Sequence, residues 1–255
     1  LGLLVSYSND EILTAGDEPF MMAQLYNQTV AVGPDRSAAA ALLLRNQNVD
    51  LFILDDGFQH RQIQRHFDLL LLGNDAIGSV LPAGPFREPK ENLCRADGLL
   101  LTGGQNSWQA RINGDRTDTV FIGSLQPIVL IGFATNRWKE FPLTLLYRSK
   151  VLTVTGIADP RGLYGTIHEW EGELVEALEF PDHHIYTARD WQQINRAAQL
   201  VDLIVTTEKD ILKLIRFPFP KDKLLALRVA MKVENGESLI GAIVDKVNQA
   251  QENYR

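Results

Sequence analysis

Cysteine is nearly absent from this sequence, in which Cys94 is the one thiol among 255 residues. A single cysteine excludes a disulfide framework and any zinc site built from several cysteines, and we expect a reducing compartment. Basic residues do not dominate either: 25 Lys and Arg stand against 32 Asp and Glu, for a net charge of −7. This balance argues against a general nucleic-acid binder, because phosphate neutralisation needs clustered Lys and Arg, but it leaves a local anion site open. Long apolar runs are missing too, since stretches such as 38–44 fall far short of the roughly 20 residues that cross a bilayer.

The residues that are present have the proportions of an ordinary globular protein. Hydrophobic residues make up 45%, charged residues 22% and aromatic residues 8%. These proportions exclude collagen-like, low-complexity and intrinsically disordered chains. The length suits one large α/β domain or two modest ones.

Apolar runs of strand length recur along the chain and mostly do not alternate with polar residues. Such runs are typical of strands buried on both faces of a parallel sheet. We predict strands at 3–6, 51–54, 67–72, 99–101, 128–133, 151–154, 203–205 and 224–229. Helical patterns lie between several of them, at 38–45 after a cap from Asp35 or Ser37, at 188–200 and at 237–249. The alternation predicts a three-layer α/β fold.

The chain changes character near its middle. Residues 105–119 are polar and contain Gly, Asn and Asp, and a mixed region follows to about residue 149. We predict an N-terminal α/β unit at 1–108, a linker with extended structure at 109–149 and a C-terminal α/β unit at 150–255. Because the chain begins with Leu1 and runs at once into a strand-like segment, we also expect an N-terminal truncation.

Two adjacent acids, Asp55 and Asp56, follow the apolar run 51–54 and precede a glycine turn. Ligands of open α/β sheets bind beyond the carboxyl ends of the strands, where these carboxylates could hold magnesium with a nucleotide. Gln59 and His60 come directly after them. A plain polar turn explains an Asp-Asp-Gly sequence about equally well.

Two further segments place charged side chains near predicted turns. Asp17 and Glu18 precede a predicted helix at 20–26 with Pro19 in its first turn, and Asp17 could simply cap that helix. The rigid loop 81–89, rich in proline, presents Arg87 and Glu88. Arg87 could bind a phosphate through two hydrogen bonds, or form an ordinary surface salt bridge.

The C-terminal half offers histidines and a glycine turn. The turn 156–164 could expose backbone N–H groups to an anion, although one glycine is weak support. His183 and His184 follow Asp182, and a histidine beside a carboxylate suits a general base. A metal site at the histidine pair is the minor alternative, since adjacent residues rarely reach one ion. Thr207 and the acids after it fit a helix start without any further function.

Taken together, six segments in order resemble the motif series of the tetraacyldisaccharide 4′-kinases, the lipid A kinases of Gram-negative bacteria. They are 16–19, 55–60, 81–89, 156–164, 180–184 and 206–210, within a similarity from about residue 1 to about residue 230. The resemblance implies an α/β fold, a P-loop-kinase-like parallel sheet sandwich with a second, smaller α/β domain and a two-stranded linker between them. It implies transfer of the γ-phosphate of ATP, with Mg²⁺, to the 4′-hydroxyl of a tetraacylated glucosamine disaccharide 1-phosphate. It also implies lipid A biosynthesis in peripheral contact with the cytoplasmic face of the bacterial inner membrane.

The resemblance also implies roles for individual residues. Asp17 and His183 would form the catalytic pair that takes the proton from the sugar hydroxyl, and His184 would be a neighbour. Asp55 and Asp56 would take the magnesium-associated positions. The residues lining the same site would be Glu18, Gln59, His60, Arg87 and Glu88. These roles suit phosphoryl transfer, which depends mainly on positioning and charge neutralisation, and a base and a metal site on different domains would make catalysis depend on closure.

One family motif has no counterpart in these 255 residues. The Walker A sequence Gly-x-x-x-x-Gly-Lys-Ser/Thr does not occur, and the family's membrane-anchoring helix would be missing as well. Without the lysine and the loop amides, the phosphates of ATP lose their main contacts. We therefore expect this polypeptide to be inactive or nearly so, while its parent gene product is the kinase.

Two other functions stay open. An acidic pair after a strand could belong to a magnesium-dependent phosphatase, although the position two residues beyond Asp55 is Gly57 rather than a second acid. The chain could also be a non-catalytic remnant or lipid-binding module that keeps the acyl-sugar surface without the ATP site. Release of phosphate from a monoester without ATP would favour the phosphatase. Binding of the lipid without any response to ATP would favour the lipid-binding module.

Overall fold

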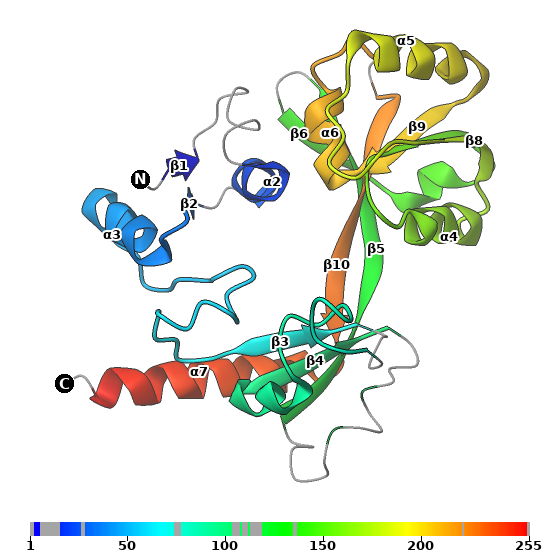
Figure 1. The fold of residues 1–255 in the computed structure, drawn as a ribbon. Helices are drawn as coiled ribbons and strands as arrows, with labels where there is room; N and C mark the ends of the chain where they lie inside the picture. Colours follow the sequence, from blue (N-terminus) through cyan, green and yellow to red (C-terminus); the bar gives the residue numbers. More distant parts are fainter. Residues whose placement is uncertain are drawn as a thin grey trace. The chain divides into compact units, whose positions relative to one another are not determined.

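The computed structural model describes residues 3–5, 16–26, 29–73, 78–103, 108, 112, 119–134, 137–220 and 222–253. They form two compact units, each assembled from two stretches of chain (Figure 1). Unit 1 combines Leu1–Phe52 with Pro127–Val229, and unit 2 combines Ile53–Gln126 with Ala230–Arg255. This division differs from the contiguous boundaries at 108 and 149, because two long strands, β5 (Val120–Ala134) and β10 (Leu224–Val233), contribute residues to both units.

The sheet of unit 1 is mostly parallel, as the unalternating apolar runs predict. Its order is β5-β10-β9-β7-β8, where β7 is Lys150–Thr155, β8 is Glu173–Glu179 and β9 is Leu203–Thr207. The pairs β7 with β8, β7 with β9 and β9 with β10 are all parallel. Strand β6 (Arg137–Phe141) runs antiparallel to β5. The predicted strands at 128–133, 151–154, 203–205 and 224–229 are confirmed within these elements.

Helices cover both faces of this sheet. Alternate residues of β7 point to opposite faces, so Leu152 and Val154 join one buried cluster while Val151 joins another. Helix α4 (Arg161–Glu169) packs on the Val151 face. Helices α5 (Ala188–Ala197), α6 (Glu208–Leu214) and α2 (Asp17–Tyr26) contribute to the Leu152 face. The predicted helix 188–200 is α5 continued by a 3₁₀ turn, Ala198–Leu200. Another 3₁₀ turn, Leu143–Leu146, precedes β7. The predicted three layers are confirmed.

The N-terminal stretch adds a small two-stranded sheet. Strand β1 (Leu3–Val5) pairs antiparallel with β2 (Val30–Val32), which confirms the strand predicted at 3–6 as far as residue 5. Helix α3 (Arg36–Asn46) follows, and the carboxylate of Asp35 accepts hydrogen bonds from the N–H groups of Ser37 and Ala38. Of the two caps that the sequence left open, Asp35 and Ser37, the structure has Asp35.

The strand predicted at 51–54 is wrong. Residues 51–54 adopt no regular structure, and Leu51, Phe52 and Ile53 are exposed. A strand exists only where a neighbouring strand accepts its backbone hydrogen bonds, and none of the described strands pairs with this segment. The apolar run therefore remains an irregular connection that leads into the acidic turn at Asp55 and Asp56.

Unit 2 contains the parallel strands β3 (Leu69–Leu72), β4 (Gly98–Thr102) and the first part of β5. A 3₁₀ helix, Lys90–Arg95, leads into β4. Helix α7 (Gly236–Asn253) buries Leu239 against Leu100 and Phe121. The strands predicted at 67–72 and 99–101 and the helix at 237–249 are confirmed, while most of the polar stretch 105–119 lies outside the described residues. No helix in the described part of the chain is both long and apolar enough to cross a membrane.

Candidate active site

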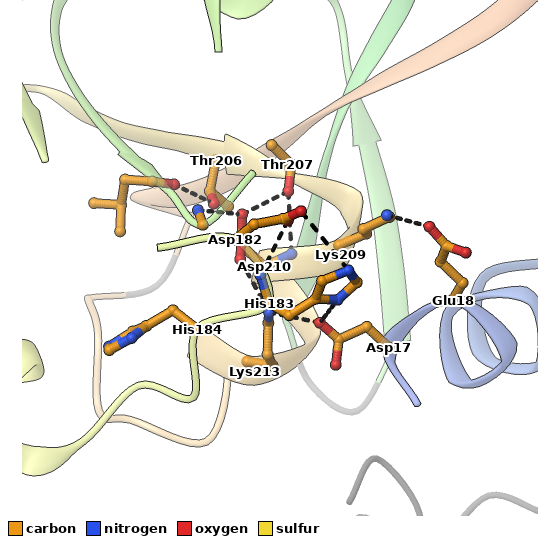
Figure 2. Close-up of polar contacts among 12 residues, drawn as sticks. Asp17, Glu18, Asp182, His183, His184, Thr206, Thr207, Lys209, Asp210 and Lys213 are labelled. Carbon is orange, nitrogen blue, oxygen red and sulfur yellow. Dashed lines mark hydrogen bonds and ion pairs between the residues drawn. The ribbon is translucent and has the colours of Figure 1, made fainter. Parts of the chain in front are cut away.

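Unit 1 brings Asp17 and His183 together although 166 positions separate them (Figure 2). Asp17 is the first residue of α2, and His183 lies in the loop between β8 and α5. The Nδ1 atom of His183 lies 3.3 Å from Oδ2 of Asp17. The Asp17 side chain is 13% exposed and the His183 ring 59% exposed, so the carboxylate is sheltered and the imidazole reaches solvent. The side chain of Asp17 thus contacts another segment rather than capping its own helix.

The backbone around His183 is held in an unusual conformation. Its φ is +59°, in the left-handed region that side-chain-bearing residues other than Asn, Asp and His seldom adopt. The His183 N–H donates to the carbonyl of Gly156 at 3.2 Å and to the carboxylate of its neighbour Asp182 at 3.0 Å. Such strained residues cluster at functional sites, where surrounding contacts hold them. The turn therefore presents the ring toward Asp17.

A buried ion pair lies behind Asp17. Lys213 of α6 donates to Oδ2 of Asp17 at 2.9 Å, and its Nζ lies 3.2 Å from Oδ1 of Asp210. Asp210 has no exposed side-chain surface, and it also accepts hydrogen bonds from the Gly156 N–H at 2.9 Å and the Thr207 hydroxyl at 2.8 Å. Gly156 permits this approach, because a Cβ there would lie 3.1 Å from Asp210 Oδ1. The carboxylate of Asp210 thus links the β7 loop to α6.

Two C-terminal segments, the helix start at Thr207 and the turn 156–164, are explained by contacts within the protein. The Thr207 side chain accepts from the Asp210 N–H, so Thr207 caps α6 as predicted. The N–H of Gly156 donates to the Asp210 carboxylate, and the N–H of Arg161 at the start of α4 donates to the Asp159 carboxylate. Arg161 also holds the pKa of Asp159 at about 2 through side-chain and backbone hydrogen bonds. In the turn 156–164, which could have offered its N–H groups to an anion, two of these groups therefore bind the protein's own carboxylates.

His184 faces a different environment from His183, and Figure 2 shows its side chain pointing away from Asp17. Its ring stacks on Phe180 with centroids 4.8 Å apart, and Nε2 lies 3.1 Å from Oδ2 of Asp190. Because the two histidines contact different carboxylates, they do not converge on one point. His184 belongs to the packing at the start of α5.

Asp190 supports that packing and gives a pH-dependent prediction. Partial burial acts to raise the pKa of Asp190, but hydrogen bonds from the Thr187 N–H and from His184 outweigh it, and the pKa lies below its usual range. The ionised form therefore stabilises the fold above the unfolded pKa of about 3.9, and this stabilisation disappears as the pH falls through the folded pKa. We expect Asp190→Asn to lower the free energy of unfolding by about 1 kcal/mol at pH 7.

Urea unfolding at pH 7, 5 and 3 checks this prediction, with the difference between the proteins expected to shrink at pH 3. Asp245→Asn, at an exposed position of α7, is the control and is expected to have little effect at any pH. A destabilisation by Asp190→Asn that stays constant from pH 7 to pH 3 would contradict the prediction.

Glu18, the second acid of α2, forms an ion pair with Lys209 of α6. Sequence reasoning missed Lys213, and it included Lys209 in the segment 206–210 without assigning it a partner. The sequence does contain a weak indication for Lys213. Helix α6 has the sequence Glu-Lys-Asp-Ile-Leu-Lys-Leu, in which Lys213 stands between two buried leucines. A lysine on an apolar face is buried only when it is paired, so its partners had to be acids.

The acidic turn lies in unit 2, where it borders a cleft of about 270 Å³. Asp56, Gln59, Arg87 and Glu88 all line this cleft. Asp55 and His60 are not among its lining residues. Unit 2 therefore brings together four of the six residues that the sequence assigns to this part of the site.

Within the cleft, Arg87 and Asp56 form an ion pair of 2.7 Å that is largely exposed. The surface salt bridge foreseen for Arg87 is thus present, and its partner is the candidate magnesium ligand. Glu88 instead accepts from Arg95 at 2.6 Å and from Asn92 at 2.8 Å, contacts that tie the loop to the following 3₁₀ helix. These contacts therefore give Glu88 a structural role, which is to hold the loop against the 3₁₀ helix.

Comparison with known proteins gives a consistent result. The family model described as tetraacyldisaccharide-1-P 4′-kinase matches residues 2–248. The tetraacyldisaccharide 4′-kinase of Syntrophus aciditrophicus is 33% identical over 245 residues, which cover 87% of this chain and 63% of the relative. That of Chelativorans sp. is 32% identical over 259 residues, covering 99% of this chain and 71% of the relative.

The fold has a counterpart among solved structures. The crystal structure of LpxK from Aquifex aeolicus in complex with ATP superposes with a TM-score of 0.74 at 27% identity, covering 97% of this chain and 75% of that one. The match confirms the α/β class and the P-loop-kinase-like sheet that the sequence predicts. The chain spans less than two thirds of the Syntrophus aciditrophicus relative and 65% of a relative from Anaeromyxobacter sp..

Proposed function

Because the chain belongs to the tetraacyldisaccharide 4′-kinase family, we propose that its parent protein transfers the γ-phosphate of ATP to the 4′-hydroxyl of a tetraacylated glucosamine disaccharide 1-phosphate. The observation that carries the proposal beyond family membership is the contact between Asp17 and His183. It supplies a base and its orienting carboxylate, which is what a hydroxyl nucleophile requires.

The proposed proton transfer follows from the geometry of this pair. The Asp17 carboxylate accepts a hydrogen bond from Nδ1–H of His183, which leaves the lone pair on Nε2 to accept the proton of the 4′-hydroxyl. The hydroxyl oxygen then bonds to the γ-phosphorus, the bond from that phosphorus to the β,γ-bridging oxygen breaks, and ADP leaves. The proton ends on His183, and Asp17 stabilises the imidazolium that results.

Mg²⁺ is part of the proposal, with Asp55 and Asp56 as its protein ligands. Both carboxylates are exposed at one turn, and among the described residues no cage of three or more His, Cys, Asp or Glu surrounds them. This donor set fits Mg²⁺, which usually takes one or two carboxylates together with phosphate oxygens and water. When bound, the ion would neutralise charge on the phosphates. Arg87, the present partner of Asp56, and Gln59 would contact the nucleotide phosphates in the cleft that Asp56 lines.

The proposal also covers the setting of the reaction. An acylated disaccharide is held in a lipid bilayer by its chains, so we place the enzyme in peripheral contact with the cytoplasmic face of the inner membrane. The 255 residues contain no Walker A sequence, and we propose that this polypeptide by itself turns over at background level. His60, Glu18 and Glu88 stay in the proposed lining of the site.

The test is transfer of ³²P from labelled ATP to the acylated disaccharide 1-phosphate by the complete gene product, with the 255-residue chain assayed beside it. We expect phosphorylation at the 4′-position by the complete product, background transfer by the 255-residue chain, and loss of transfer when EDTA removes Mg²⁺. Restored transfer on adding excess Mg²⁺ is the control for EDTA.

Three results would contradict the proposal. Transfer that is indifferent to EDTA would remove the assignment of Mg²⁺. Release of phosphate from a monoester without ATP would favour a phosphatase. Binding of the acylated disaccharide with no response of the complete product to ATP would favour a lipid-binding module.

A further inference from the structure

We propose that Lys213 is a positioning residue that fixes the Asp17 carboxylate in the orientation its partner His183 needs. The inference rests on the proposed function, because it assigns a role within the same pair. Nothing in the sequence motifs singles out Lys213, which is identified only by its place in the structure.

The first support is that one oxygen atom serves both partners. Oδ2 of Asp17 accepts the Lys213 ammonium at 2.9 Å and lies 3.3 Å from Nδ1 of His183. Rotation of the carboxylate away from His183 would break the stronger, charged hydrogen bond to Lys213 at the same time. The lysine therefore restricts the carboxylate to the rotamer that faces the imidazole.

The second support is that Lys213 is itself immobilised. Its side chain is only 3% exposed, and Asp210, with no exposed surface, pairs with it on the other side. Asp210 is fixed in turn by the Gly156 N–H and the Thr207 hydroxyl. The ring of Tyr186 lies 5.8 Å from the ammonium. A flexible surface lysine could not orient a carboxylate, but one held at three sides can.

The third support comes from charge. Two carboxylates, Asp17 and Asp210, share the one buried ammonium of Lys213. Replacement of buried ion pairs by apolar residues is often neutral or stabilising, so stability alone gives little reason for a lysine here.

The other charged groups near Asp17 and His183 have contacts of their own. Asp182 Oδ2 lies 3.8 Å from Nε2 of His183, and Glu18 is paired with Lys209. Among the described residues, Lys213 donates to the Asp17 carboxylate, whereas Lys209 pairs with Glu18 and Asp182 lies near His183. The orienting contact to Asp17 is thus assigned to Lys213.

The test measures which ring nitrogen of His183 carries the proton, using ¹⁵N-histidine NMR of the 255-residue chain above pH 8, with the signal assigned by its loss in His183→Asn. The tautomer is set by the hydrogen bond at Nδ1, so we expect the Nδ1-protonated form to dominate. In Lys213→Met its share should fall to about half or less, while Lys213→Arg should restore part of it. Lys223→Met is the matched control, since the Lys223 ammonium donates to the backbone carbonyl of Ala198 at 2.6 Å and not to a carboxylate among the described residues, and it should leave the tautomer unchanged.

The same variants in the complete gene product separate positioning from binding. We expect Lys213→Met to lower kcat by about 10- to 100-fold with little change in KM, because misplacing a catalytic group affects the transition state and not substrate affinity. If Lys213→Met does not fold, Lys213→Met with Asp210→Asn removes the stranded buried charge and keeps an acceptor for Gly156, and it should show the same tautomer change.

The outcomes are distinguishable from failure of the proposed function, because the tautomer measurement does not require kinase activity. A tautomer change in the 255-residue chain, together with a complete gene product that lacks kinase activity, would support the role of Lys213 and refute the kinase. An unchanged tautomer and an unchanged kcat in the folded Lys213 variants would overturn the inference, even where His183 proves essential. A rise in KM with kcat unchanged would also overturn it, since it would make Lys213 a binding residue.

Discussion

Replacing His183 with asparagine in the complete gene product is expected to lower kcat by about 10²- to 10⁴-fold, the usual contribution of a general base. Asparagine is the appropriate substitute because it tolerates the left-handed backbone that His183 adopts at a φ of +59°. Alanine at this position would add backbone strain to the loss of the base. Steady-state kinetics with ATP and the acylated disaccharide measure the effect.

Stability and a partner variant serve as controls for this result. The His183 ring is 59% exposed, so His183→Asn should leave the urea midpoint nearly unchanged. Asp17→Asn should cause a loss in kcat of similar size, and the double variant should be little worse than either, because residues that act as a unit are not additive. Full turnover by His183→Asn would remove His183 from proton transfer.

Replacing Asp210 with alanine is expected to lower the free energy of unfolding by about 3–5 kcal/mol, the typical cost of removing one partner of a buried ion pair. Asp210 has no exposed side-chain surface, forms an ion pair with Lys213 at 3.2 Å, and accepts hydrogen bonds from the Gly156 N–H and the Thr207 hydroxyl. Its loss leaves a buried ammonium with Asp17 alone and a buried N–H with no acceptor. Chemical denaturation of the 255-residue chain measures the change.

Asp202→Ala is the matched control. Asp202 also accepts a hydrogen bond from a backbone N–H, that of Lys150 at 2.8 Å, but it lies at an exposed position. It should cost only about 0.5–1.5 kcal/mol. Asp210→Asn should fall between the two alanine variants, since the amide oxygen still accepts a hydrogen bond. Equal effects of Asp210→Ala and Asp202→Ala would show that burial of the ion pair contributes nothing.

Much of the fold could be predicted from local patterns in the sequence. The central strands β7 and β9 are apolar runs without alternation, and the caps at Asp35 and Thr207 follow from side chains that compete for backbone N–H groups. These features depend on neighbours in sequence. The apolar run 51–54 has the same local signal but is not a strand, because strand formation depends on a distant partner.

The candidate site was predictable only in part, for the same reason. Asp17 alone fits a helix start, and its contact with His183 across 166 positions follows from packing that no local pattern contains. Family resemblance supplied that pair, and it also selected His183 over His184, which the separate contact of His184 with Asp190 supports. Lys213 escaped notice because a lysine between leucines looks like an exposed residue until its burial is known.

The interleaved connectivity of the two units has a consequence for how the chain is made. A ribosome delivers residues in order, and domains generally fold as their last segment emerges. Leu239 of α7 shares a buried cluster with Phe121, which is synthesised 118 residues earlier. Until α7 emerges, unit 2 keeps an uncovered apolar face, while unit 1 has all its residues once Val229 is free. A polypeptide that stops after Val229 is therefore expected to expose this apolar face and to be cut by proteases faster than one that includes α7.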